Sequence, residues 1–158
     1  MPYDARVIAN YFLTLAIRDG IPIFPVKMQK LIYLAHGWSL AFRGQPLVTD
    51  EVQAWRYGPV VPAVYRAFKQ YSGTAIQAPA QVPANTQIDE ESRELIENVW
   101  SRYGSLSATQ LSALTHEPGF AWDLTVKSAN PFFTPVMKNA LIADEFQRRR
   151  NQQQHANG

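Results

Sequence analysis

The stretch from residue 28 to residue 65 constrains the fold most strongly, because an apolar helix, a turn, a short extended run and a second helix follow one another there almost without a break. In its first part, apolar residues recur at the three- and four-residue spacing of a helix: Leu31, Leu34, Ala35, Trp38, Ala41 and Phe42. Such a stripe predicts a core helix with one wide face covered by the rest of the chain. Gly37 lies inside this pattern at a cost of about 1 kcal/mol relative to Ala, which predicts that another element approaches the helix backbone there.

The segment after this helix predicts a short extended element and then another helix. Gly44 is the expected end of the core helix. The alternation of polar and apolar residues at positions 51–55 predicts one half-buried strand, within a short β-hairpin or extended segment at residues 47–56. Tyr57-Gly58-Pro59 breaks the chain direction, and Pro62 fits the first turn of a helix because its missing N–H has no intrahelical partner there.

Four further helices are predicted from capping residues and apolar periodicity. They begin near Asp4, near Asp89, near Ser107 with its capping-box partner Gln110, and at Thr134-Pro135. Residues 73–86 and 117–133 lack a period and are predicted to be loops, the second with enough aromatic residues that we expect it to pack on the domain. The chain has 158 residues and is 46% hydrophobic, which is enough for one core. We therefore predict a mainly α, single compact domain of about six helices over residues 1–150 and a disordered polar tail at residues 151–158.

The sequence contains none of the motifs that mark the common enzyme and cofactor sites. It has no Cys, no glycine-rich phosphate loop and no nucleophile elbow, so we expect neither catalysis nor a cofactor or metal. No signal peptide and no apolar run of membrane-spanning length is present, which predicts a cytoplasmic protein that does not enter the membrane. We expect His36 to be a buried, hydrogen-bonded imidazole. His116 is a possible proton-transfer or metal group with Glu117 and Asp123, but the spacing favours a role in tying its helix to the next loop.

Several motifs in order resemble the Panacea domain, the superfamily of SocA-like antitoxins and phage-associated proteins. The first signature comprises residues 28–38, 44–47 and 54–65, and a second comprises residues 111–117 followed by Ala121-Trp122. The family commonly has Pro where this chain has Ala121. The resemblance covers about residues 5–147, and the family motif positions in this sequence are His36, Gly37, Trp38, Gly58, Pro59, Val60, Tyr65 and Thr115.

The resemblance implies an antitoxin that neutralises a cognate protein toxin, often encoded beside it, by direct protein–protein binding. It leaves two alternatives open: an adaptor that delivers the toxin to a host protease, and a prophage or mobile-element accessory protein that binds a host defence or regulatory protein. Because one scaffold serves many toxins, we expect specificity on residues 73–86, residues 117–133 and the tail. The partner-binding candidates are Trp55, Tyr57, His116 and Trp122.

Nucleic-acid binding is the weaker hypothesis. On this hypothesis, basic residues of the first half gather on one surface near Tyr33, Trp55 or Tyr57: Lys27, Lys30, Arg43, Arg56, Arg66 and Lys69. Such residues can hold phosphates and stack bases, but here the aromatics follow helical stripes that favour core packing. A DNA-bound autoregulator would lose affinity steeply as salt rises. The sequence carries no signal for an oligomeric state.

Overall fold

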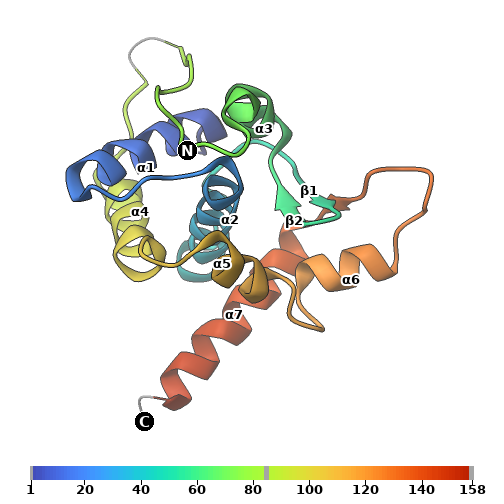
Figure 1. Cartoon of the computed structure of the whole chain (residues 1–158). Coiled ribbons are helices and arrows are strands. Elements are labelled where there is room, and N and C mark those ends of the chain that lie inside the picture. Colours follow the sequence, from blue (N-terminus) through green and yellow to red (C-terminus); the bar gives the residue numbers. More distant parts are fainter. Residues whose placement is uncertain (1, 84–85, 157–158) are drawn as a thin grey trace.

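Seven helices and a small sheet at one side of them make up this computed structural model, which describes residues 2–83 and 86–156 (Figure 1). The helices are α1 Ala5–Asp19, α2 Pro25–Arg43, α3 Pro62–Phe68, α4 Glu90–Tyr103, α5 Ala108–Thr115, α6 Ala121–Lys127 and α7 Asn139–Ala156, with a 3₁₀ turn η1 at Lys69–Tyr71. The strands are β1 Val52–Trp55, β2 Gly58–Val60 and β3 Val136–Met137. The architecture is the mainly α single domain that the sequence predicts.

Helix α2 is the centre of the core. It contacts α1, α4, α5 and α7, and every residue from Lys27 to Ala41 is buried. The predicted apolar stripe is buried except for Phe42 at its end, which confirms the core helix, but burial is not limited to one face because neighbours cover the helix on all sides. A helix that is buried all round must also bury polar side chains, and α2 does so with Lys27, Gln29, Lys30 and His36.

Gly37 lets α7 approach α2, as its position in the pattern predicts. A Cβ atom on Gly37 would lie 2.2 Å from Cε2 of Phe146, a fully buried residue of α7. The Phe146 ring is held on both sides, at 5.6 Å from the ring of Tyr33 and 5.1 Å from that of Trp38. The ring has little room to move away.

Substituting Gly37→Ala is expected to destabilise the fold by about 1–3 kcal/mol, because the added methyl group overpacks the contact with Phe146. Urea denaturation measures this change. The double variant Gly37→Ala with Phe146→Leu should cost less than the two single changes combined, since the smaller side chain makes room for the methyl. A Gly37→Ala variant as stable as the wild type would contradict this account of the helix contact.

The three strands form an antiparallel sheet in the order β2–β1–β3. The strand predicted at residues 51–55 is confirmed as β1, and it forms a hairpin with β2, with Trp55 opposite Gly58; β2 begins at Gly58, beyond the predicted segment of residues 47–56. The prediction of a helix start at Thr134-Pro135 is wrong: the N–H of Ala54 donates to the carbonyl of Pro135 at 2.9 Å, Val136 and Met137 pair with β1, and α7 begins only at Asn139. Residues 136 and 137 pair with the open edge of β1, and this pairing outweighs the local helix signal of Thr134-Pro135.

Three more expectations about the second half need correction. Residues 117–133 are not one irregular loop, because α6 occupies Ala121–Lys127 and its N-cap Phe120 is buried. The packing expected of that loop's aromatics fails for Phe132 and Phe133, which are 88% and 73% exposed. Helix α7 passes residue 150, where we expected order to end, and reaches Ala156.

Three of the four predicted capping groups are confirmed, those at Asp4, Asp89 and Ser107. The carboxylate of Asp4 accepts from the N–H of Arg6 at 2.9 Å, and that of Asp89 accepts from the N–H of Ser92 at 2.8 Å. Ser107 and Gln110 form the reciprocal bonds of a capping box at the start of α5.

None of the helices in residues 2–83 and 86–156 combines the length and the hydropathy that a membrane span requires.

Candidate partner-binding site

The structure brings the four partner-binding candidates together at the β1–β2 hairpin. The indole N–H of Trp122, on α6, donates to the backbone carbonyl of Trp55 at 2.8 Å. The ring of His116, at the end of α5, lies 4.2 Å from the ring of Trp122, centroid to centroid. Tyr57 is at the hairpin turn and is 72% exposed. Trp122 thus contacts the hairpin directly and His116 packs against Trp122, whereas the side chain of Tyr57 faces solvent.

His116 has a structural environment. Its Nδ1 lies 2.6 Å from the carbonyl oxygen of Ser112, so this nitrogen carries a proton and donates to the last turn of α5. Asp123 accepts from the N–H of Gly119 at 2.8 Å and pairs with Lys127 at 3.0 Å. No group of three His, Asp or Glu side chains suited to a metal gathers anywhere in residues 2–83 and 86–156.

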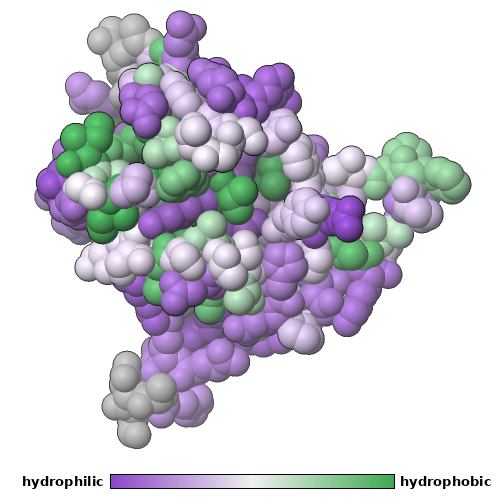
Figure 2. All heavy atoms as spheres, in the orientation of Figure 1, coloured by the Kyte–Doolittle hydropathy of each residue, from purple (hydrophilic) through white to green (hydrophobic). Residues whose placement is uncertain are grey.

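An apolar groove of about 620 Å³ opens between the start of α2, the hairpin and α3. The ring of Trp55 meets the ring of Tyr65 edge-on at 5.0 Å and forms one wall. The other apolar lining residues are Phe24, Pro25, Val26, Tyr57, Val60, Val64 and Ala108. Hydrophobic residues gather on this face between α3 and α5 in Figure 2.

Lys30 lies at the floor of this groove, with its side chain only 1% exposed. Its ammonium group donates to the carbonyl oxygens of Tyr57 at 3.1 Å and Pro59 at 3.5 Å. Burial lowers the pKa of Lys30 to about 8. Gly58 allows the hairpin to close over it: its φ is +123°, and a Cβ there would lie 2.4 Å from Nζ of Lys30 and 3.1 Å from Cε1 of His116.

The sequence pattern did not reveal this role of Lys30 and grouped it instead with the basic residues of the nucleic-acid hypothesis. One signal was available. Lys30 lies in a helix that is predicted to form the core. If such a helix is covered on all sides, a Lys in it has no contact with solvent and needs polar partners inside the domain. Gln29 gives the same signal, since its amide both accepts from the N–H of Val61 at 2.8 Å and donates to its carbonyl at 3.2 Å.

Most family motif positions lie inside the domain. His36 is buried: its Nε2 bonds Asn139 Oδ1 at 2.9 Å, its Nδ1 accepts from the N–H of Val48 at 3.4 Å, and burial lowers its pKa. The hydroxyl of Thr115 donates to the carbonyl of Ser112 at 3.0 Å. Tyr65, by contrast, is exposed at the groove wall.

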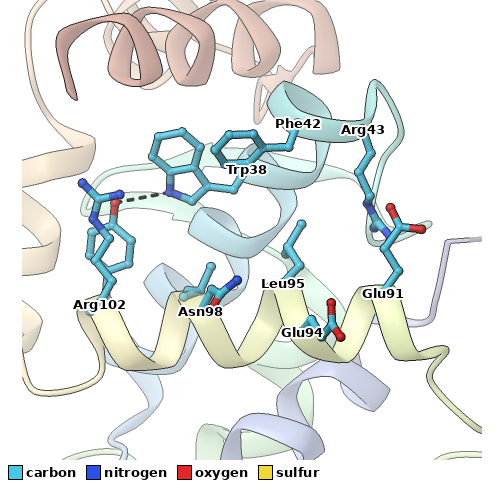
Figure 3. A pocket seen from close by; sticks show the side chains of 10 residues that line it. Trp38, Phe42, Arg43, Glu91, Glu94, Leu95, Asn98 and Arg102 are labelled. Atoms are coloured by element: carbon cyan, nitrogen blue, oxygen red, sulfur yellow. Dashed lines mark hydrogen bonds between the residues drawn. The ribbon is translucent and has the colours of Figure 1, made fainter. Parts of the chain in front are cut away.

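A second pocket, of about 370 Å³, lies between α2 and α4 (Figure 3). The indole N–H of Trp38 donates to the hydroxyl of Tyr103 at 3.2 Å, and the Trp38 ring stacks on Phe42 at 5.3 Å. Side chains of both charges line this pocket: Arg43, Glu91, Glu94 and Arg102. The mixed charge selects no single class of ligand.

The loop between α6 and β3 extends outward from the rest of the fold in Figure 1, and it contains Phe132 and Phe133, which are largely exposed. Because Gln53 pairs with Val136 and the N–H of Ala54 bonds Pro135, the residues before β3 leave the sheet at the end where β1 turns into Tyr57. Phe132 and Phe133 therefore lie on a loop that leaves the sheet at the end where Tyr57 is exposed, and of the three only Tyr57 lines the groove. We call Tyr57, Phe132 and Phe133 the aromatic edge.

Comparisons with known proteins point to one family. Residues 28–123 match the family described as Antitoxin SocA-like, Panacea domain. The chain is 38% identical over 130 residues to Antitoxin SocA of Caulobacter vibrioides (strain NA1000 / CB15N), a match that covers 77% of this chain and 69% of that relative. No solved structure matches the chain.

Proposed function

The chain belongs to the family of SocA-like antitoxins with a Panacea domain, and from this membership we propose that it neutralises a cognate protein toxin by binding it directly. The observation that carries the proposal is the aromatic edge. Monomeric proteins rarely leave large apolar surface patches in solvent, and exposed aromatic residues supply most of the binding energy in many protein interfaces.

The proposed mechanism is steric sequestration of the toxin, with no chemistry performed by this chain. Tyr57, Phe132 and Phe133 insert into the toxin surface, and the groove beside Tyr57 receives a further toxin segment. Trp122 fixes the hairpin through its bond to the Trp55 carbonyl, so that the edge is presented in one arrangement. Such preorganisation reduces the entropy lost on binding.

A co-expression experiment tests this function. The gene adjacent to this one is expressed alone and with this chain, and growth is followed while the complex is isolated through a tag on this chain. We expect growth arrest from the adjacent gene alone, and rescue together with a stable complex when both are present. Arrest that persists while this chain is soluble and abundant would overturn the proposal.

The same cultures separate the two alternatives. A protease adaptor would lower the amount of toxin in the cell, and that loss would disappear in a protease-deficient strain, whereas sequestration leaves the toxin level unchanged. An accessory protein of a prophage would capture a host protein and show no dependence on the adjacent gene.

A further inference from the structure

We propose that the groove between α2, the hairpin and α3 binds an apolar toxin segment that carries a carboxylate, and that the ammonium group of Lys30 receives this carboxylate at the groove floor. The inference rests on the proposed function, since it names the toxin as the partner. It adds the chemical class of the segment and the residue that selects it.

The groove is lined by positive charges only, which favours a negatively charged ligand. Lys30, Arg56 and Lys69 line it, and no Asp or Glu is among its lining residues. Two backbone carbonyls accept from Lys30, and an ammonium group has three N–H donors, so one donor has no acceptor among the described residues. Within the described part of the chain, none of the ion pairs involves Lys30. A buried cation without an anion is costly, and a carboxylate from a partner would compensate for that cost.

The walls of the groove are mostly apolar, which favours a ligand with apolar side chains. Phe24, Val26, Val64 and the Trp55–Tyr65 pair present mostly apolar surface around the single buried cation. A hydrated nucleic-acid backbone is a poor match for such walls, because it needs cations along its whole path. Apolar side chains flanking one Asp, Glu or C-terminal carboxylate match both the walls and the floor.

The arrangement of the hairpin links the site to the aromatic edge. Lys30 bonds the carbonyl of Tyr57, the residue whose side chain begins the edge. A toxin that contacts Tyr57, Phe132 and Phe133 is therefore already next to the groove entrance. The groove adds selection for charge to a contact that is otherwise apolar.

Lys30→Met tests the inference, with the purified toxin from the adjacent gene as the probe in calorimetry at pH 7. We expect at least a tenfold higher Kd and a melting temperature equal to or above that of the wild type, since the variant removes a buried unpaired charge. The matched control is Lys27→Met. Lys27 is also a buried lysine of α2, but it bonds the carbonyl of Gly104 and does not line the groove, so its loss should leave the Kd unchanged.

The pH dependence of binding supplies a second readout. Lys30 loses its charge as the pH rises through about 8, so the wild type should bind the toxin about tenfold more weakly at pH 9 than at pH 7. The titratable and charged groups that face Lys30 or line the groove with it are Arg56 and Tyr57 of the hairpin, Tyr65 and Lys69 beyond it, and His116 of α5. The Lys30→Met variant retains all of them, so it should lose this part of the pH dependence.

The outcomes are distinct. If the wild type binds the toxin and Lys30→Met binds equally well with the same pH profile, the inference is wrong and the proposed function stands. If the wild type does not bind the toxin, the proposed function fails and the inference fails with it. If a labelled single-stranded oligonucleotide of mixed sequence binds the wild type and loses affinity on Lys30→Met, the groove serves nucleic acid and the inference is also wrong.

Discussion

Replacing Phe132 and Phe133 together by Ala is expected to abolish toxin neutralisation while leaving the free energy of unfolding within about 0.5 kcal/mol of the wild-type value. Both side chains are largely exposed, so neither contributes much to the core. An aromatic residue at the centre of an interface costs about 2–4 kcal/mol of binding free energy when truncated. Loss of two such anchors would weaken binding by a factor of roughly 1,000 or more.

Growth rescue in co-expression and the Kd of the purified pair measure this loss, and urea denaturation checks the fold. Ile17→Ala is the matched control, because Ile17 is 83% exposed but lies on α1, apart from the groove lining and the aromatic edge. The control should neutralise the toxin like the wild type. Full rescue by the double variant would exclude the loop as an anchor and leave the hairpin and groove to account for binding.

Sequence patterns predicted the fold well where the signal is local. Asp4, Asp89 and the Ser107–Gln110 pair act within one helical turn, so their capping bonds follow from the sequence alone. Thr134-Pro135 gives an equally good local signal for a helix, but β1 lies within reach and pairs with residues 136–137. Strand pairing depends on contacts distant in sequence, which a local pattern does not contain.

For the candidate site, the sequence indicated candidate residues but not how they are arranged, because their arrangement depends on contacts that are distant in sequence. Trp55, Tyr57, His116 and Trp122 were selected as residue types, and their meeting at one hairpin came only with the structure. Aromatic composition did not distinguish Trp122, which supports the hairpin, from Phe132 and Phe133, which extend into solvent. Whether an aromatic residue is buried depends on which surface lies opposite, and that surface comes from elsewhere in the chain.

The second large effect is expected at Glu145, a fully buried carboxylate of α7 that the sequence analysis did not select. It accepts from the hydroxyl of Tyr33 at 2.8 Å and from the N–H of Ala121 at 3.1 Å, and it pairs with Arg149 at 3.0 Å. Arg149 lies within α7, one helical turn after Glu145. Arg149 also bonds the carbonyl of Leu114, so this network joins α2, α5, α6 and α7.

Glu145→Ala is expected to reduce the free energy of unfolding by about 3–5 kcal/mol, because it leaves the Arg149 guanidinium buried without a counter-charge. Asp144→Ala provides the control: its pair with Arg148 is solvent-exposed, so its loss should cost no more than about 1 kcal/mol. Both changes are measured by urea denaturation.

The double variant Glu145→Leu with Arg149→Met decides whether the lost stability reflects an unpaired charge. If it does, removing both charges should recover most of the stability, since apolar residues of similar volume can replace a buried ion pair at little cost. If the double variant is as unstable as Glu145→Ala, the bonds to Tyr33 and Ala121 are the important ones. In that case α6 loses its attachment to α7, and because α6 precedes the loop of Phe132 and Phe133, toxin binding should fall together with stability.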